Sequence, residues 1–211
     1  MIYPCLYNAP LVYYALILHE HKPFVVEHYD HYTKQTFRNR CSILGGNGTM
    51  DIVVPVVKNH GKKTLMKDVL IDYDSSWQAV HWKSIHSAYA SSPFFEYVAD
   101  YYEPYYSKRY KYLADLNCDL LFTTLELLNF DLTFTKSDDF TPLDSMDDLR
   151  DTIHPKKAFK VGSMVYTPFP YQQVFSDRHG FKDNLSILDL LFNEGQNAAM
   201  ILKNSVSSSE Q

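Results

Sequence analysis

Arg38, Asn39 and Arg40 form the densest group of side chains in this 211-residue chain that could bind a ligand, and Lys34 and Gln35 lie just upstream of them. Guanidinium groups bind phosphates and carboxylates through paired hydrogen bonds, and an ammonium adds a compact positive charge. The group therefore predicts a site for an anionic small molecule. We expect Lys34, Arg38 and Arg40 to hold the anion, and Gln35 and Asn39 to bind its hydroxyl or amide groups.

The spacing of the two arginines predicts how they would act. We expect both to lie on one β-strand, over residues 38–44. Residues two apart on a strand project to the same face, so the two guanidinium groups could grip one anion. Arginine suits a structural role equally well, in which Arg38 and Arg40 pair with buried acids such as Glu27 or Asp30. The sequence leaves both interpretations open.

Two histidines are candidates for proton transfer. His28 follows Glu27 near the end of a predicted strand, where a carboxylate could orient its ring; a polar side chain entering a loop is the alternative. His81 lies on a predicted helix with Trp77, and a place in the core with its ring bonded to a backbone carbonyl is the alternative. His28 and His31 would point to opposite faces of a strand, so we predict no metal site there.

Further candidate binding residues lie elsewhere in the chain. Asn8 follows the first predicted strand, and ligands of parallel sheets tend to lie at the carboxyl ends of strands. Trp82 and Tyr89 could stack on a sugar or base ring, although this pattern on a helix is also typical of core packing. Arg178 precedes the last predicted helix, whose N-terminus favours an anion; pairing of Arg178 with Asp177 is the alternative.

The amino-acid composition argues against several classes of protein. The formal net charge of -5 weighs against nucleic acid as a partner, even for the Tyr-rich run at 97–112 with its interleaved lysines and arginine. Cys5, Cys41 and Cys118 are odd in number, far apart in sequence and form no CxxC pair. We therefore predict no thiolate zinc site, and a reducing cytoplasmic compartment. No signal peptide is evident, and no apolar run approaches the roughly 18 residues of a transmembrane span.

The elements that must position these residues predict an α/β fold. Residues 2–6, 11–18 and 24–27 have the pattern strand, helix, strand, which is typical of a parallel βαβ unit. Residues 45–48 are Gly-Gly-Asn-Gly between two apolar segments, 38–44 and 51–57, which predicts a β-hairpin. We expect a small mixed, partly parallel sheet with helices packed around it, in one domain over 1–204 with a disordered polar tail at 205–211.

Helices and short strands are expected farther along the chain. The predicted helices cover about 75–91, 93–112, 114–129 and 187–194, and the predicted strands cover 69–71, 132–134 and 160–165. Ser186 is the expected N-cap of the last helix, with Asp189 three residues on in a capping-box pattern. Gly195 is the expected stop.

Four groups of residues resemble the WbqC-like proteins of bacteria. They are Lys34-Gln-Thr-Phe-Arg-Asn-Arg-Cys41 with Asn47-Gly48 and Val54-Pro55-Val56; Trp77, His81-Trp-Lys-Ser-Ile85, Ala88-Tyr89 and Ser92-Pro-Phe-Phe95; Leu113-Ala-Asp-Leu-Asn117; and Tyr171-Gln172, Phe175, Gly180-Phe181 and Asn184 to Gly195. The resemblance covers nearly the whole chain in order. The region between Asp139 and Val165 is shorter here than in longer members of the family.

The resemblance implies a function in broad terms. WbqC-like proteins occur among genes for surface-polysaccharide, or O-antigen, synthesis, and no reaction is firmly attached to them. It favours a transferase-type enzyme of surface-glycan biosynthesis that acts on a nucleotide-sugar or another anionic small molecule. The alternative is a non-catalytic binding or assembly protein that docks a partner through the strand of Arg38 and Arg40. The residues identify no cofactor and no oligomeric state.

Overall fold

The N-terminal elements form the predicted βαβ unit in a computed structural model that describes residues 1–58, 63–130, 133–140, 142, 148–155, 159 and 164–208. Strand β1 (Ile2–Pro4), helix α1 (Leu11–Glu20) and strand β2 (Phe24–Glu27) follow one another, and β1 pairs with β2 in parallel. Strand β5 (Phe134–Lys136) adds to the other side of β2, also in parallel. The prediction of a mixed α/β fold with an N-terminal βαβ unit is confirmed.

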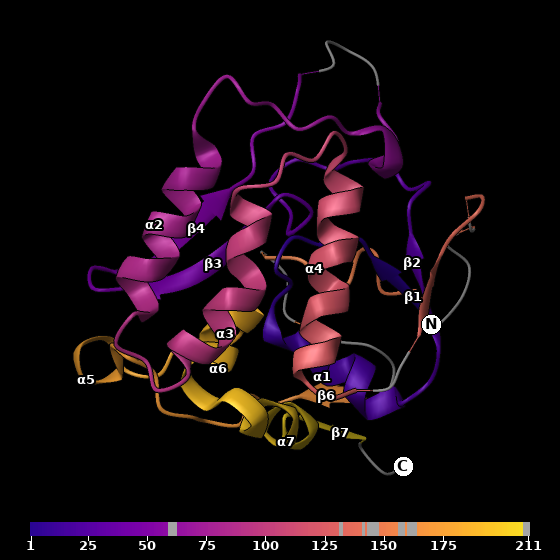
Figure 1. Cartoon of the computed structure of the whole chain (residues 1–211). Helices are drawn as coiled ribbons and strands as arrows, with labels where there is room; N and C mark the ends of the chain where they lie inside the picture. The colour runs from indigo at the N-terminus through magenta and orange to yellow at the C-terminus, as the bar shows by residue number, and fades with distance from the viewer. Residues whose placement is uncertain are drawn as a thin grey trace.

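Helix α1 lies in the interior because it is apolar on every side. Every residue from Leu11 to Leu18 is buried, which is the pattern of a helix surrounded by protein. His21 takes a left-handed conformation directly after the helix and donates its backbone N–H to Ile17 O, so the helix ends there. Helix α1 packs against α6 (Ile187–Glu194) and α7 (Ala198–Asn204), which lie beside it in Figure 1.

The predicted β-hairpin is confirmed, with different limits. Strand β3 (Arg40–Gly45) pairs antiparallel with β4 (Gly48–Val53) through a two-residue turn. Gly48 has a φ of +107°, a backbone conformation that other residues rarely adopt. The strand begins at Arg40 rather than Arg38, because the preceding residues form turns whose backbone bonds elsewhere: Phe37 O accepts from Tyr7 N.

Of the three α-helices that the described residues form between β4 and β5, two follow the prediction and one does not. Helices α2 (Trp77–Tyr89) and α4 (Leu113–Leu127) match predicted segments, whereas the helix expected over 93–112 is too long. Helix α3 (Phe95–Tyr102) ends in a 3-10 turn, Glu103–Tyr106, whose second residue is proline. Proline lacks the N–H that would continue an α-helix. Figure 1 shows α2, α3 and α4 on the viewer's side of the molecule, with β3 and β4 behind α2.

Three predicted segments differ in the structure. No strand forms at 69–71; Leu70 and Ile71 make only isolated bridges, to Tyr112 and Val56. Strand β6 (Met164–Tyr166) pairs antiparallel with β7 (Val206–Ser208), so residues 206–208, which the sequence assigned to a polar tail, complete a two-stranded sheet. Residues 209–211, much of 139–165, and residue 132 of the strand expected at 132–134 lie outside the described residues.

The limits of α6 are those predicted, but the capping box is incomplete. Ser186 is the N-cap and its hydroxyl accepts from Leu188 N at 3.4 Å. The Asp189 carboxylate does not turn back to the cap, because it accepts hydrogen bonds from Tyr171 Oη at 2.6 Å and Gln173 Nε2 at 2.9 Å. A short helix, α5 (Ser176–His179), precedes α6 and was not expected. No helix in the described ranges combines the length and apolarity needed to cross a membrane.

Candidate anion-binding site

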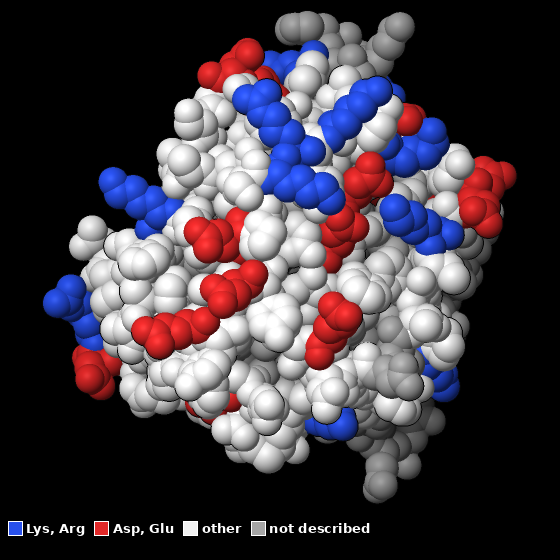
Figure 2. Space-filling view, in the orientation of Figure 1, with Lys and Arg blue, Asp and Glu red and all other residues white. Residues whose placement is uncertain are grey.

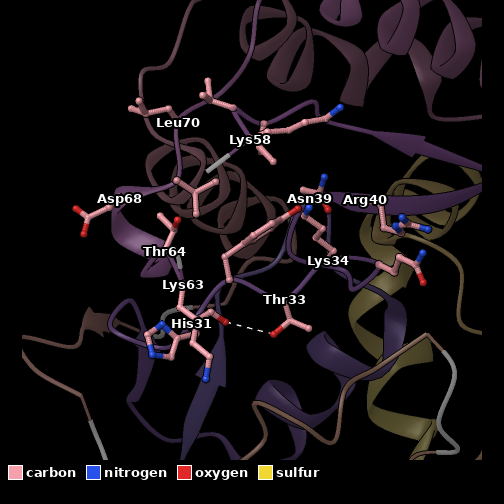
Figure 3. A pocket seen from close by; sticks show the side chains of 15 residues that line it. His31, Thr33, Lys34, Asn39, Arg40, Lys58, Lys63, Thr64, Asp68 and Leu70 are labelled. Carbon is pink, nitrogen blue, oxygen red and sulfur yellow. Dashed lines mark hydrogen bonds between the residues drawn. The ribbon is translucent and has the colours of Figure 1, made fainter. Parts of the chain in front are cut away.

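An open cavity of about 810 Å³ lies between the turn before β3 and the segment that follows β4. Its lining comes from residues 31–35, 39–40, 56–58, 63–64 and 68–70, and Figure 3 shows their side chains arranged around one space. The volume falls in the range of small-molecule sites, about 300–1,000 Å³. The size therefore suits a ligand such as a nucleotide or a sugar phosphate.

Positive charge dominates the lining of this cavity. Its cationic side chains are Lys34, Arg40, Lys58 and Lys63, and Asp68 is the one carboxylate among the described lining residues. Asp68 already pairs with Lys67, whose Nζ lies 3.0 Å away. Figure 2 shows Lys and Arg side chains gathered toward the top of the view, where the segment between β4 and α2 runs in Figure 1. The cavity therefore favours an anion.

Two lining residues carry buried polar atoms that are unsatisfied within the described part of the chain. Asn39 donates its Nδ2 to Val54 O at 2.8 Å, whereas its Oδ1 has no partner there. Arg40 pairs through Nη1 with Asp51 Oδ2 at 3.3 Å, whereas its buried Nε has none. Buried polar atoms are nearly always hydrogen-bonded, so these two leave unused hydrogen-bonding capacity in the wall of the cavity, although both atoms are closed to solvent.

Local backbone geometry holds the two walls of the cavity in place. Gln35 has a φ of +60°, and Thr36 Oγ1 donates to Thr33 O at 2.8 Å, which closes a tight turn around Lys34. Across the cavity, Tyr32 N donates to Thr64 O at 2.9 Å. Segments far apart in the sequence are thus joined by main-chain bonds, and Lys34 and Gln35 stand exposed at the rim.

Arg38 lies outside the cavity. Its side chain is buried in the turn before β3 and pairs with Asp30. The expectation that Arg38 and Arg40 project from one face of a strand is wrong, because Arg38 precedes the first strand residue. Of the two roles that the sequence left open for Arg38, pairing with a buried acid is the one that this geometry fits.

The structure also places His81 outside the cavity. Its ring lies in the core, with Nδ1 3.0 Å from Tyr7 Oη and Nε2 3.1 Å from Val53 O. A carbonyl only accepts, so Nε2 carries the proton of the neutral ring and donates to Val53 O. Burial lowers the pKa of His81 to about 4, against the smaller opposing effect of the Val53 carbonyl. His81 therefore occupies the core position that the sequence allowed as its alternative.

The ring of His28 is also buried, and its two nitrogens have partners. Nδ1 lies 2.9 Å from Val26 O, and Nε2 lies 3.3 Å from Cys118 Sγ. This ring contributes nothing to the lining of the cavity. Of the histidines in the described residues, His31 is the one that lines it, at the opposite wall from Arg40 (Figure 3).

Asn8 and Trp82 pack around one tyrosine in the interior. Asn8 takes a left-handed conformation, with a φ of 39°, and donates its Nδ2 to Tyr106 Oη at 3.1 Å. Trp82 stacks on the ring of Tyr106, with centroids 5.4 Å apart. Neither side chain lines the cavity.

Tyr89 and Arg178 also lie away from the cavity. Tyr89 is fully buried, and its hydroxyl accepts from Leu44 N at 3.2 Å. Arg178 donates its Nη1 to Gly46 O at 3.1 Å. Gly46 is in the turn of the hairpin, whereas Arg40 begins β3 at the other end, so one strand length separates Arg178 from the cavity. The structure thus brings together Lys34, Gln35, Asn39 and Arg40 from the predicted set.

Sequence reasoning missed the second wall of the cavity. Lys58 and Lys63 belong to a segment in which three of six residues are lysines, a signal of positive charge at positions 58–63. That signal does not tell where Lys58 and Lys63 lie in space. Main-chain bonds of their neighbours place these two residues, such as Val57 N to Leu70 O at 2.9 Å.

A second hollow, of about 960 Å³, has the opposite character. It lies between α3, the end of α4 and the end of α6, and its charged lining residues are Glu126 and Glu194. No lysine or arginine is among its described lining residues. An anion would be repelled there, so the basic cavity is the better candidate site.

Comparison with known proteins places the chain in a family. Residues 7–157 match the model of the WbqC-like protein family, so the chain belongs to this family. The matched span contains the described lining of the basic cavity and ends before the segment from Tyr171 to Gly195.

The chain is also similar to an uncharacterized protein of Mycobacterium tuberculosis, Rv1507c. The two are 26% identical over 194 residues, covering 82% of this chain and 84% of the relative. No solved structure matches the chain.

Proposed function

We propose that this protein binds an anionic small molecule, such as a nucleotide-sugar, in the basic cavity. We also propose that it acts on this molecule as a transferase-type enzyme of surface-glycan biosynthesis. The observation that carries the binding proposal is the lining: Lys34, Arg40, Lys58 and Lys63 face one space with a single, already paired carboxylate. Such a cavity concentrates positive potential, which attracts phosphate or carboxylate groups.

The chemistry within the cavity would divide between its two walls. Arg40 would hold a phosphate through the guanidinium donors that Asp51 does not use. Gln35 and Asn39, which line the same wall as Arg40, would bind hydroxyl or amide groups of the ligand. His31, exposed on the opposite wall, would take the role of general base or acid. The transferase role is supported by the occurrence of WbqC-like proteins among genes of surface-polysaccharide synthesis.

Docking of a partner through Arg38 and Arg40 is a weaker proposal. It requires both guanidinium groups at the surface of one strand, whereas Arg38 is 4% exposed and paired with Asp30. The cavity, by contrast, uses Arg40 alone. The structure therefore favours a small ligand over a docked protein.

Ligand binding can be tested with a thermal-shift screen of nucleotide-sugars, inorganic phosphate and acyl donors, followed by calorimetry. A ligand that binds only the folded state raises the unfolding midpoint. At a free ligand concentration of 100 times the Kd, it stabilises the folded protein by about 2.7 kcal/mol. We expect Lys34→Ala and Arg40→Ala each to weaken binding about tenfold, as for loss of a charge-assisted hydrogen bond. Lys83→Ala removes the same charge from an exposed position on α2 and should bind as wild type does.

The outcome separates binding from catalysis. Equal affinity in Arg40→Ala, Lys83→Ala and wild type would remove the cavity from the proposal. Binding that is lost in Arg40→Ala, combined with no turnover of the bound nucleotide-sugar in the presence of acceptor sugars, would leave a binding protein. Turnover that is lost in His31→Asn while affinity is kept would support the transferase role.

A further inference from the structure

Three potential metal ligands from separate elements meet in the protein core. Cys5 follows β1, His28 follows β2, and Cys118 lies on α4. One ligand atom from each residue lies within 4.8 Å of the other two. All three side chains are buried, with exposed fractions of 2%, 5% and 4%. Within the described ranges this is the one group of three such ligands.

The orientation of the His28 ring suits metal binding. Its Nδ1 lies 2.9 Å from Val26 O, and because a carbonyl only accepts, Nδ1 carries the proton and donates. The lone pair of Nε2 then points toward Cys118 Sγ, 3.3 Å away. Histidines that bind metals are commonly held in this way, with the other ring nitrogen donating to a backbone carbonyl.

The ligand separation is close to that of a zinc site. With zinc–sulfur bonds of about 2.3 Å and zinc–nitrogen bonds of about 2.0–2.1 Å, tetrahedral geometry separates sulfur and nitrogen ligands by about 3.5 Å. Cys118 Sγ and His28 Nε2 are 3.3 Å apart, so a small shift would accommodate the ion. A pair of thiolates with one imidazole is a donor set that zinc prefers.

Metal binding would change the protonation of the cysteines. The thiolate is the form of cysteine that binds metals. In the structure Cys5 Sγ donates to the Ala114 carbonyl oxygen at 3.8 Å, and a divalent cation would displace that proton.

A fourth polar group lies beside the cluster. Asn117 precedes Cys118 and is buried, and its Nδ2 donates to Arg38 O at 2.9 Å. Its Oδ1 is buried without a partner among the described residues. A buried amide oxygen without a partner calls for one. Asn117 Oδ1 or a water molecule could thus complete four-fold coordination.

We infer that Cys5, His28 and Cys118 form a binding site for a thiophilic divalent cation, with Zn²⁺ as the ion that this donor set suits best. This inference differs from the prediction, made from the spacing of the cysteines, that the chain has no thiolate zinc site. The ligands come from positions 5, 28 and 118, so no short motif signals them. Bound metal would join the ends of β1 and β2 to α4.

The test uses the full-length protein, purified with reductant, stripped with a chelator and titrated with Co²⁺. We expect one cobalt per chain, the near-ultraviolet absorption of thiolate-to-cobalt charge transfer, and displacement of Co²⁺ by an equimolar amount of Zn²⁺. Zinc should also raise the thermal midpoint of the stripped protein, because an ion that binds only the folded state stabilises it. No charge-transfer band and no zinc-dependent rise in a folded wild-type protein would overturn the proposal.

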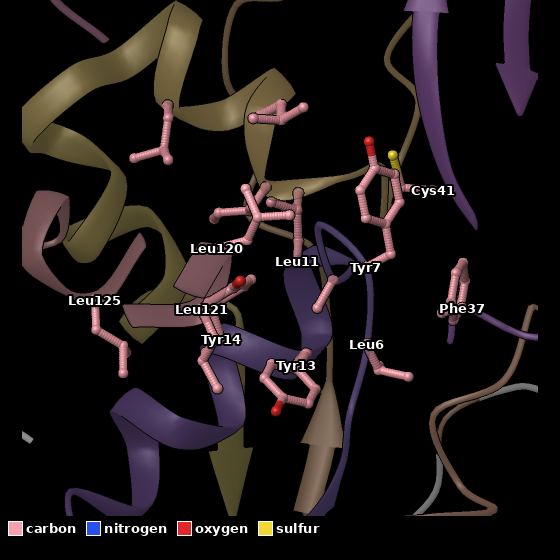
Figure 4. Packing of buried hydrophobic residues seen from close by; sticks show 14 of the residues in the cluster. Leu6, Tyr7, Leu11, Tyr13, Tyr14, Phe37, Cys41, Leu120, Leu121 and Leu125 are labelled. Carbon is pink, nitrogen blue, oxygen red and sulfur yellow. The ribbon is translucent and has the colours of Figure 1, made fainter. Parts of the chain in front are cut away.

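Cysteine variants provide a matched comparison. Cys118→Ala and Cys5→Ala should lose the charge-transfer band, whereas Cys41→Ala should keep it. Cys41 is equally buried and lies beside Tyr7 in Figure 4, but it is not a member of the cluster of potential ligands. Equal cobalt binding by Cys118→Ala and Cys41→Ala would contradict the assignment. Should Cys118→Ala fail to fold, the stoichiometry and the band of the wild-type protein decide the question alone.

Discussion

Arg38 donates to Asp30 inside the protein, whereas Arg40, two residues later, faces Asp51 and the basic cavity. The turn before β3 gives the two arginines different environments, because it buries Arg38 and leaves Arg40 at the rim of the cavity. The same contrast applies to histidines: His81 is enclosed by core partners, and His31 stands exposed in the cavity. At the residue scale, the environment rather than the residue type decides which side chains can meet a ligand.

Burial of His81 makes the stability of the protein depend on pH. Its pKa is about 4 in the folded protein against an ordinary value of 6.5, so the unfolded chain binds a proton more readily between these values. The free energy of unfolding should therefore fall as the pH falls from 6.5 to 4. His81→Gln should lack this contribution, which amounts to about 3 kcal/mol at pH 4.

Urea denaturation of both proteins at pH 7, 6, 5 and 4 measures this contribution. The comparison cancels titration of other groups, because only position 81 differs. Free energies of unfolding that run parallel for wild type and His81→Gln from pH 7 to pH 4 would show that the buried ring does not exclude a proton.

Helix α6 ends at Gly195, where the backbone packs closely against the aromatic ring of Phe94. Gly195 has a φ of +53°, and a Cβ built on it would lie 2.7 Å from Phe94 Cγ. Phe94 N donates to Phe192 O at 3.0 Å, so the start of α3 is tied to α6 at this point. The glycine is thus needed for its backbone conformation and for its lack of a side chain.

Gly195→Ala should destabilise the protein more than Gly48→Ala does. Both residues have a positive φ, and each substitution should cost about 1–3 kcal/mol of strain. A Cβ on Gly48 meets no atom within 4 Å, whereas one on Gly195 overlaps Phe94 and should cost about 1–3 kcal/mol more. Denaturant midpoints of the two variants test this, and equal losses would mean that the ring of Phe94 moves aside freely.

A buried ion pair connects distant parts of the whole molecule. Arg150 Nη1 lies 3.2 Å from Glu27 Oε2, and both side chains are almost fully buried. Arg150 also binds Asp148 through its guanidinium, and Leu149 N donates to Ile2 O at 2.9 Å. The segment at 148–155 is thereby held against β1 and the end of β2. This segment therefore covers the β1 edge of the parallel sheet.

Removal of one charge from this pair should be more harmful than removal of both. Arg150→Met leaves Glu27 buried without its cation and should cost about 3–5 kcal/mol, as for other broken buried pairs. Adding Glu27→Gln removes the carboxylate charge that Arg150 faced and should recover part of the loss. Denaturant unfolding of the wild type, Arg150→Met and the double variant tests this coupling. A double variant that is less stable than Arg150→Met would contradict it.

Local backbone signals were sufficient for much of the fold. The limits of β2 follow from a β-branched run, the hairpin turn from Gly-Gly-Asn-Gly, and the limits of α6 from Ser186 and Gly195. Each of these depends on the preferences of a few consecutive residues. The same reasoning failed for the helix expected over 93–112, where Pro104 ends the α-helical pattern, and for β7, whose pairing with β6 joins residues about 40 positions apart.

By itself, the sequence determined the family resemblance, the α/β class and one wall of the candidate site, because Lys34, Gln35, Asn39 and Arg40 are neighbours along the chain. Only the tertiary structure placed Lys58 and Lys63 opposite them, buried Arg38 against Asp30, and brought Cys5, His28 and Cys118 together. The physical reason is the separation along the chain of the residues that determine each feature. Turns and helix ends are set by adjacent residues, whereas burial, ion pairing and shared ligands depend on segments that meet only when the chain is folded.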